Sequence, residues 1–342
     1  MNKTVRVAIN GAGRIGRAFY RLAREHLEIE VVAINDLGSV ENIAYLMRHD
    51  SVYGRPSFVV ETNGINLVVD GREIRHFSEV DPKNLPWKNL NIDVVVEATG
   101  AFTSYAKAKA HLDAGARRVV VTAPMKDGPE AGISGATVLM GVNEEKLSTC
   151  LITSNASCTT NAGSPLIAIL DEALGIEKAV LNTTHGYTAS QSLVDGPSKK
   201  NMREGRAAAQ NIVPSRTGAA IAVTKAFTKL EGLFDGIAVR VPVVAGSLVD
   251  VTFISKRPTS REEVNEILKK AAEDKRWEDV FAVTEEELVS SDIIGDRHGS
   301  LADLNFTRVV GGNLVKVLAW YDNEMGYAQT LLNHVIKLGQ YI

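Results

Sequence analysis

Buried strands and amphipathic helices alternate along the first half of the chain. Continuous β-branched runs predict strands over residues 4–10, 29–34, 93–100 and 118–122. Helical spacing of apolar positions follows over residues 17–25, 39–47 and 103–114, and short antiparallel strands are expected within 58–74. This alternation predicts a doubly wound, parallel α/β sheet, whose ligands lie at the carboxyl ends of its strands.

The second half follows a different pattern. Apolar periodicity predicts helices over residues 159–174, 260–273 and 327–338, and a further helix opens after Thr217 and Gly218. Strands are predicted over residues 179–184, 233–242, 247–254 and 314–321. These elements indicate an α+β domain with a mainly antiparallel sheet and helices on one face. Residues 191–216 show little periodicity, so they are expected to form a long functional loop.

Composition narrows the class of protein. The 342 residues fit two globular domains, since 45% are hydrophobic and 23% are charged. A net charge of −3 does not favour nucleic acid or an anionic membrane as the main partner. The two cysteines, Cys150 and Cys158, form neither a disulfide framework nor a metal-binding pattern, which suits a reducing compartment. Without a secretory leader or an apolar run near the ~18 residues that span a bilayer, a soluble, cytoplasmic protein is expected.

A glycine motif follows the first predicted strand. Gly11-Ala-Gly-Arg-Ile-Gly16 lies between a strand and a helix, and Asp36 ends the next strand. This arrangement predicts a dinucleotide site, in which the glycines admit a pyrophosphate and the acidic residue holds ribose hydroxyls. Because Asp36 would repel a 2′-phosphate, NAD is favoured over NADP. The alternative is a tight turn of the kind found in any βαβ unit. Three strand-end residues are further ligand candidates or solvated strand ends: Asn35, Thr99 and Thr122.

A candidate nucleophile lies between an apolar run, residues 150–152, that predicts a buried strand and the start of a predicted helix. Residues 154–161 read Ser-Asn-Ala-Ser-Cys-Thr-Thr-Asn, which places Cys158 beside unpaired backbone N–H groups. The helix dipole there should favour the thiolate, and the N–H groups could stabilise an oxyanion in acyl transfer. His185, at the end of a predicted strand, is the natural general base for such a thiol. The alternatives are a small buried hydrophobe at Cys158 and a capping or packing role for His185.

Anion-binding candidates occur in the second half. Arg240 lies inside a predicted strand, where arginine needs a phosphate, a carboxylate or another anionic partner. The N–H groups after Thr217 and Gly218 open a helix and could bind an anion. A basic cluster comprises Lys199, Lys200, Arg203 and Arg206. It is either a solvated face or a contact for an anionic ligand or another subunit.

Several segments together resemble the phosphorylating glyceraldehyde-3-phosphate dehydrogenases nearly end to end. The segments are 10–17, 154–161, 185–188, 217–220, 238–242 and 320–324, with further similarity over 81–87 and 295–296. The cysteine segment is highly specific, whereas the glycine motif is shared by many dinucleotide-binding proteins. The resemblance implies a Rossmann-type NAD-binding domain over 1–157 and a catalytic domain over 158–321. It also implies a C-terminal helix, 322–342, that packs on the NAD-binding domain.

The resemblance also implies a reaction and its residues. Cys158 would attack the aldehyde to form a hemithioacetal while His185 accepts the proton, hydride would pass to NAD⁺, and inorganic phosphate would split the thioester. Thr188 and Arg240 would hold the C3 phosphate of the substrate. The attacking phosphate would be held by Ser157, Thr159, Thr217 and Gly218. Cofactor positions of the family correspond to Gly11, Arg14, Ile15, Asp36, Thr99, Thr122 and Asn323. The 191–216 segment resembles one that reaches a neighbouring subunit, which implies a homotetramer.

The chain departs from the family pattern mainly on the cofactor and subunit side. The departures are Ala12, Ala101, Ala162, Ala189, Ser190, Gly196, Ile221 and Met325, with about one inserted residue after Pro197. They leave Cys158 and His185 unchanged. The nearest rival family is erythrose-4-phosphate dehydrogenase, which usually lacks the equivalents of Thr188 and Thr217-Gly218. Aspartate-semialdehyde dehydrogenase has different flanking motifs, and a non-catalytic NAD- or RNA-binding scaffold would not need the cysteine and histidine.

Overall fold

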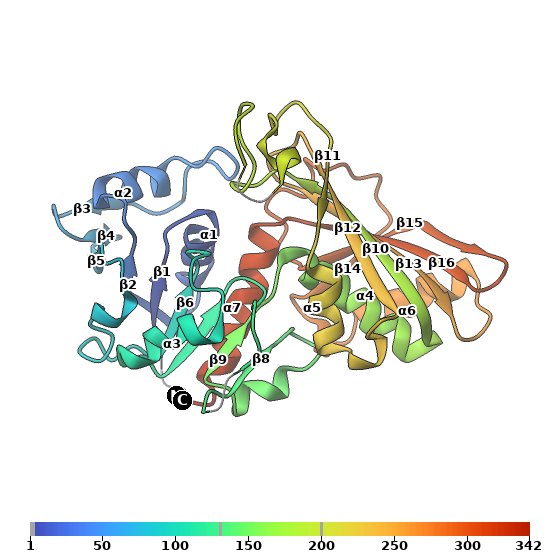
Figure 1. Ribbon diagram of the computed structural model, residues 1–342, viewed down its shortest axis with the longest axis horizontal. Helices are drawn as coiled ribbons and strands as arrows, with labels where there is room; N and C mark the ends of the chain where they lie inside the picture. Colours follow the sequence, from blue (N-terminus) through green and yellow to red (C-terminus); the bar gives the residue numbers. More distant parts are fainter. Residues whose placement is uncertain (1–3, 130–131, 199–200) are drawn as a thin grey trace. The chain divides into compact units, whose positions relative to one another are not determined.

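The computed structural model describes residues 4–129, 132–198 and 201–342 (Figure 1). The chain divides into two compact units. The first comprises the residues up to Val138, Asn143–Ala156 and Leu331–Ile342, and the second comprises Leu139–Val142 and Ser157–Thr330. No helix of the described residues is long and apolar enough to cross a membrane.

Nine strands of the described residues form the sheet of the first unit, in the order β3-β4-β5-β2-β1-β6-β7-β9-β8. The strands are β1 (Val5–Asn10), β2 (Ile29–Asn35), β3 (Val60–Thr62), β4 (Leu67–Val69), β5 (Arg72–Phe77), β6 (Val94–Glu97), β7 (Arg118–Val121), β8 (Gly135–Thr137) and β9 (Ile152–Ser154). From β5 to β8 the neighbours are parallel, while β3, β4 and β5 form an antiparallel meander. The predicted doubly wound parallel sheet is confirmed.

Helices connect the parallel strands of the first unit. They are α1 (Arg14–Ala23), α2 (Val40–Arg48) and α3 (Tyr105–Asp113), with short 3₁₀ turns η1 (Pro82–Asn84) and η2 (Glu144–Ser148). Ser39 and Ser104 cap α2 and α3 through their side chains. Gly13 caps α1 without a side-chain hydrogen bond. The start of α1, like any helix N-terminus, favours negative charge.

Seven strands of the described residues form the sheet of the second unit, in the order β11-β12-β10-β13-β16-β15-β14. The strands are β10 (Ile176–Gly186), β11 (Val213–Arg216), β12 (Phe234–Val241), β13 (Ser247–Ser255), β14 (Phe281–Thr284), β15 (Ser300–Val310) and β16 (Leu314–Tyr321). Only the β10–β12 and β14–β15 pairs are parallel. The predicted mainly antiparallel sheet is confirmed.

One face of this second sheet packs against helices (Figure 1). They are α4 (Cys158–Leu174), α5 (Ala219–Ala226) and α6 (Arg261–Ala272), with 3₁₀ turns η3 (Met202–Gly205), η4 (Thr228–Leu230) and η5 (Lys275–Trp277). Helix α4 is buried along most of its length, with Leu166 and Ile167 fully enclosed by the core. The last helix, α7 (Met325–Gly339), ends in the first unit. Burial on nearly every side of α4 fixes its first residue, Cys158, against the sheet that carries β10.

Three segments of the second unit were assigned differently from sequence, one of which is the unpredicted four-residue strand β14. The expectation of a loop throughout 191–216 is wrong, because β11 and η3 lie within it and β11 is an edge strand paired with β12. Strand β15 was not predicted. Its alternation is interrupted by Asp303, which is buried and accepts a hydrogen bond of 3.1 Å from Trp320 Nε1. A polar residue with a distant tertiary partner hides the period-2 pattern of a strand.

Candidate active site

Cys158 begins helix α4 after a sharp turn. The preceding residues are Ala156, whose φ of 54° lies in the left-handed region, and Ser157, the N-cap. Ser157 Oγ accepts a hydrogen bond of 3.1 Å from the backbone N–H of Thr160. A non-glycine residue with positive φ stores strain, and such strain is often found at functional sites. The turn presents the half-buried thiol at the end of the helix rather than along its side.

His185 faces this thiol from strand β10. Its Nε2 lies 3.3 Å from Cys158 Sγ, and its Nδ1 lies 2.6 Å from the carbonyl oxygen of Gly186. A carbonyl oxygen can only accept a hydrogen bond, so Nδ1 carries the proton and donates a hydrogen bond to the Gly186 oxygen. The lone pair of Nε2 therefore points at the thiol. This tautomer can accept the proton of Cys158 directly.

Burial is the main influence on the pKa of both groups. It raises the pKa of the Cys158 thiol, while the positive charge of Arg240 acts in the opposite direction. Burial also lowers the pKa of His185 to about 3, and Arg240 adds to that effect. From the sequence we expected the helix N-terminus to make Cys158 ionise more readily. That prediction is wrong, because the cost of burying the thiolate is larger than the stabilisation by the helix N-terminus. Proton transfer from Cys158 to His185 leaves the net charge of the pair unchanged, so the thiolate can form without exchange of a proton with solvent.

Tyr321, at the end of β16, is a neighbour of the pair that the sequence analysis did not assign. Its hydroxyl lies 2.9 Å from Thr159 Oγ1 and 2.7 Å from Thr183 Oγ1. Its ring packs edge-to-face against His185, with centroids 5.9 Å apart. These contacts fix the imidazole plane and engage the hydroxyl of the residue after Cys158. Tyr321 lies within the 320–324 segment that resembles the family, but only tertiary structure brings its side chain to this pair.

Arg240 and Thr188 lie at the carboxyl end of neighbouring strands. Arg240 on β12 is directly opposite His185 in the parallel register with β10. Its Nη1 donates to the carbonyl oxygen of Gly186 at 3.4 Å. Thr188 follows the end of β10, and its Oγ1 lies 3.0 Å from Ser190 Oγ. The structure therefore places a guanidinium beside the histidine and a hydroxyl just beyond the same strand.

Thr217 and Gly218 form the start of helix α5. Thr217 Oγ1 accepts a hydrogen bond of 3.1 Å from Ala219 N, and Gly218 is the N-cap. A side chain at Gly218 would meet no atom within 4 Å, so this helix end faces open space. Together with the Ser157 turn of α4, the second unit thus contains two helix starts among the predicted anion ligands.

The glycine motif of the first unit has the geometry that a dinucleotide requires. Gly11 has a φ of +102°, which a side chain would strain, and a Cβ at Gly16 would lie 2.0 Å from the Gly11 oxygen. A Cβ at Gly13 would meet nothing within 4 Å. These are the tight turn, the close helix packing and the open backbone approach of a pyrophosphate site. Asp36 accepts hydrogen bonds from Ala12 N at 2.7 Å and Gly38 N at 2.8 Å, which fixes its carboxylate beside the motif.

The remaining predicted cofactor residues are distributed over both units. Arg14 pairs with Asp50 at 2.6 Å, and Ile15 follows it on the first turn of α1. Thr99 is exposed after β6, and Thr122 follows β7. Asn323 belongs to the second unit, where its Oδ1 accepts a hydrogen bond of 3.0 Å from Ser247 Oγ. Asn35 is buried and bonded to Asn10, which gives it a structural role within the sheet edge.

The predicted basic cluster is only partly covered by the structure. Lys199 and Lys200 lie outside the described residues. Arg203 is exposed, while Arg206 forms an exposed ion pair of 3.0 Å with Asp195. An ion pair within the segment supports the solvated-face interpretation for Arg206.

A Rossmann-type unit followed by an α+β unit with a cysteine–histidine pair defines the class of NAD-dependent aldehyde dehydrogenases that use a thiol. Comparison with known proteins narrows this class. Residues 5–105 match the family description "Glyceraldehyde 3-phosphate dehydrogenase, NAD binding domain", and residues 157–323 match the C-terminal domain of the same family. The chain belongs to the glyceraldehyde-3-phosphate dehydrogenase family. NAD, the cofactor predicted from sequence, is the cofactor of the matched N-terminal domain.

Individual relatives match over nearly the whole chain. Glyceraldehyde-3-phosphate dehydrogenase 1 of Kluyveromyces lactis is 45% identical over 97% of this chain and 98% of its own length. Glyceraldehyde-3-phosphate dehydrogenase 2 of Saccharomyces cerevisiae is 45% identical over 97% of this chain and 99% of its own length. Glyceraldehyde-3-phosphate dehydrogenase of Streptomyces coelicolor is 42% identical over 98% of this chain and 99% of its own length. The family resemblance inferred from the motifs is confirmed.

Proposed function

We propose that this protein is a phosphorylating glyceraldehyde-3-phosphate dehydrogenase of glycolysis and gluconeogenesis. It would convert glyceraldehyde 3-phosphate, NAD⁺ and inorganic phosphate into 1,3-bisphosphoglycerate and NADH. The observation that carries this proposal is the direct approach of Cys158 Sγ to His185 Nε2, at 3.3 Å, within a chain of this family. A thiol with a correctly oriented base can attack an aldehyde and hold the oxidised product as a thioester.

Cys158 and His185 divide the chemistry between them. The sulfur adds to the aldehyde carbon while His185 Nε2 receives the thiol proton, and His185 returns this proton to the former carbonyl oxygen, which completes the hemithioacetal. His185 then assists removal of the hydroxyl proton as the thioester forms. When bound, NAD⁺ supplies the hydride acceptor. Phosphate oxygen finally attacks the thioester carbon, which gives the acyl phosphate and returns the sulfur to Cys158.

Two anion sites follow from the positions of the polar side chains. Arg240 and Thr188 would bind the C3 phosphate, because the guanidinium lies opposite His185 and the hydroxyl follows the same strand. The attacking phosphate would bind to Ser157, Thr159, Thr217 and Gly218. Its support is the pair of helix starts at α4 and α5, where N–H groups favour an anion.

The cofactor residues proposed for NAD are Gly11, Arg14, Ile15, Asp36, Thr99, Thr122 and Asn323. The glycine turn supports the pyrophosphate contact, since Gly13 leaves open space in front of the backbone. The fixed carboxylate of Asp36 supports NAD over NADP, because a 2′-phosphate would meet a like charge. The boundaries 1–157, 158–321 and 322–342 remain the proposed domain limits.

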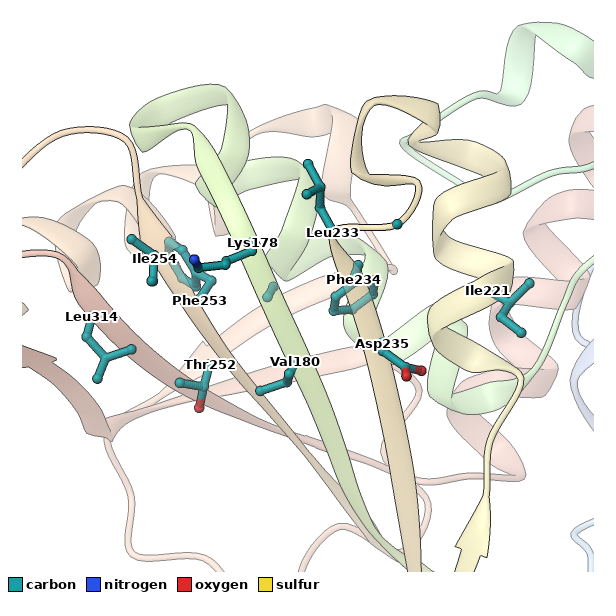
Figure 2. A pocket seen from close by; sticks show the side chains of 12 residues that line it. Lys178, Val180, Ile221, Leu233, Phe234, Asp235, Thr252, Phe253, Ile254 and Leu314 are labelled. Atoms are coloured by element: carbon teal, nitrogen blue, oxygen red, sulfur yellow. The ribbon is translucent and has the colours of Figure 1, made fainter.

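We also propose a homotetramer located in the cytoplasm, without nucleic acid as a main partner. The helix-free face of the second sheet carries exposed apolar side chains, including Val180 at 59% and Ile237 at 57% exposure. Figure 2 shows Val180, Thr252 and Leu314 on adjacent strands lining a hollow of about 640 Å³ on this unit. Exposed large apolar side chains on one face of a sheet favour association between copies of the chain. Both cysteines are free, as a reducing compartment allows.

Absorbance at 340 nm during incubation with glyceraldehyde 3-phosphate and NAD⁺ tests the reaction. Steady NADH production that requires inorganic phosphate is the expected result. Without phosphate, one NADH per active site should form and then stop, since the thioester has no acceptor. Faster turnover of erythrose 4-phosphate would assign the rival activity, and steady phosphate-independent turnover would exclude the phosphorylating mechanism.

A further inference from the structure

A network of buried polar side chains lies beneath the Gly11 turn, at the carboxyl end of the parallel sheet. Its members are each at most 4% exposed: Asn10, Asn35, Trp87, Glu97 and His111. Of these residues, only Asn35 was named from the sequence as a ligand candidate, and the other four were assigned no role in cofactor binding. Buried polar groups of this density need mutual hydrogen bonds, so their arrangement is fixed by chemistry rather than by volume alone.

The hydrogen bond from Trp87 fixes the protonation of His111. Trp87 Nε1 lies 3.1 Å from His111 Nδ1, and an indole N–H can only donate. His111 Nδ1 is therefore the acceptor and carries no proton. The proton of the neutral imidazole is then on Nε2, which donates to Glu97 Oε2 at 3.0 Å. Helix α3 thus directs an N–H donor at a carboxylate on the last residue of β6.

Glu97 accepts further hydrogen bonds from both turns of the cofactor edge. Asn10 Nδ2, from the end of β1, donates to Oε2 at 2.5 Å. The backbone N–H of Thr99 donates to Oε1 at 2.9 Å, and the Thr99 hydroxyl donates to the same oxygen. Four donors converge on one carboxylate, which compensates its burial. An apolar residue at position 97 could fill the space but could not hold these donors.

The two turns that Glu97 holds are in direct contact. A Cβ added to Gly11 would lie 2.8 Å from both Ala98 C and Thr99 N. A shift of the Thr99 turn would therefore move it into, or away from, the backbone of the glycine motif. Asn10, which precedes Gly11, is held from its other side by Asn35 Nδ2 at 2.7 Å. The exposed Thr99 backbone and the Gly11 turn are thus set by one buried side chain.

We propose that Glu97 and His111 are positioning residues for NAD. The carboxylate, oriented by the neutral Nε2–H tautomer of His111, holds the Gly11 and Thr99 turns in the geometry that receives the cofactor. The proposal rests on the proposed roles of Gly11 and Thr99 in cofactor binding. It extends those roles to residues that the cofactor does not touch.

The test is direct titration of NAD⁺ by calorimetry, with the unfolding temperature measured on the same samples. Glu97→Gln replaces one carboxylate oxygen by an NH₂ group, which would face the hydrogen-bond donors that now surround Glu97. His111→Leu removes the Nε2–H donor to Glu97. Both should weaken NAD⁺ binding roughly tenfold or more, which corresponds to losing one or two hydrogen bonds to the charged carboxylate. His111→Gln places an amide N–H near the former Nε2. The dissociation constant for NAD⁺ in this variant should stay within about threefold of the wild-type value, which is a smaller change than the loss of one such hydrogen bond would cause.

The control is Val69→Ala, a truncation in β4, which pairs only with β3 and β5 in this sheet of described strands. It should lower the unfolding temperature without changing NAD⁺ affinity. In steady state, Glu97→Gln should raise the KM for NAD⁺ more than it lowers kcat. A merely structural role would lower the unfolding temperature and leave the KM unchanged.

Several results would overturn the inference. One is an NAD⁺ affinity within about twofold of the wild type in both Glu97→Gln and His111→Leu, far short of a lost hydrogen bond. Another is an equal loss of NAD⁺ affinity in His111→Leu and His111→Gln. If Glu97→Gln and His111→Leu do not fold, Trp87→Phe tests the tautomer, because it removes the indole N–H and keeps an aromatic ring. Unchanged NAD⁺ affinity in Trp87→Phe would also overturn the inference. Absence of NAD⁺ binding by the wild type would instead reject the proposed cofactor site.

Discussion

Cys158 Sγ lies 3.3 Å from His185 Nε2, while His185 Nδ1 lies 2.6 Å from the Gly186 carbonyl oxygen. The two residues come from the first turn of α4 and the end of β10. A single proton can therefore pass from sulfur to nitrogen without movement of either backbone. The Gly186 carbonyl stabilises the imidazolium that results, because the Nδ1–H bond is retained in both protonation states.

Replacing the nucleophile should separate catalysis from cofactor binding. Cys158→Ser should lower kcat roughly 10³-fold or more, because a serine hydroxyl is far less ionised than a thiol beside the same base. NAD⁺ affinity, measured by titration, should stay close to that of the wild type. Cys150→Ser is the matched control, since Cys150 is the buried cysteine outside the site. Near-wild-type turnover in Cys158→Ser would reject the covalent mechanism.

Removing the base should change the pH dependence as well as the rate. His185→Gln should lower kcat about 10²- to 10⁴-fold at pH 7. Without the imidazole, the thiolate must form by ionisation to water, and burial raises the pKa of Cys158. The thiolate fraction then grows as pH rises, so the activity of the variant should increase steadily from pH 7 to 9, more steeply than that of the wild type. Parallel pH profiles for the two proteins would contradict the assignment of His185.

Some residues of this site could be predicted from the sequence and others could not. Gly11 and Cys158 were predicted because their chemistry depends on immediate neighbours, a strand before and a helix after. The effect of burial on the Cys158 pKa could not be predicted, since it arises from α4 packing against a sheet formed by distant strands. Tyr321 and Glu97 were missed for the same reason. Each acquires its role from partners that are far away along the chain.

The fold shows the same division. Continuous apolar runs predicted β1, β2, β6 and β7. In β1, β6 and β7 these runs are continuous because both faces of the strand are largely buried, whereas the first half of β2 is partly exposed. Strand β15 was not predicted, because its buried Asp303 depends on Trp320 of the neighbouring strand. The three-residue strand β8 is too short to show a period at all.

Arg240 should discriminate between phosphorylated and unphosphorylated substrates. Arg240→Ala should lower kcat/KM for glyceraldehyde 3-phosphate about 10- to 100-fold, the loss expected for charge-assisted hydrogen bonds. The value for unphosphorylated glyceraldehyde should fall much less. Arg261→Ala, which removes an exposed arginine at the start of α6, is the charge-matched control and should leave both values unchanged. Equal losses on both substrates would exclude Arg240 from the C3 phosphate site.

The helix-free face of the second sheet should be the surface through which copies associate. Ile237→Lys places a charge on β12, beside a hollow that the exposed Val180 also lines, and burying that charge in an interface would be costly. The variant should elute as smaller species in size-exclusion chromatography with light scattering. Leu27→Lys is the control, since Leu27 is 93% exposed on the first unit. A tetramer unaffected by Ile237→Lys would show that a different face is used.

His334 should make stability fall as pH falls. Its Nδ1 donates to Asn155 Oδ1 at 3.2 Å, and its Nε2 lies 2.8 Å from the Thr153 hydroxyl, within the buried interior of the first unit. Burial lowers the pKa of His334 from 6.5 to about 3. Between these values the unfolded chain binds the proton and the folded chain does not. The free energy of unfolding should therefore decrease as pH falls below 6.5, by up to about 1.4 kcal/mol per pH unit from this residue.

Urea unfolding at pH 7, 6 and 5 measures this contribution. His334→Gln cannot titrate, so its free energy of unfolding should lose less between pH 7 and 5 than that of the wild type. His185 has a similarly lowered pKa and remains in the variant, so part of the decline should persist. Val69→Ala removes no titratable group and should leave the wild-type slope intact while lowering the stability at each pH. Because the prediction concerns the slope and not the stability at pH 7, a uniformly destabilised His334→Gln variant with the wild-type slope would contradict it.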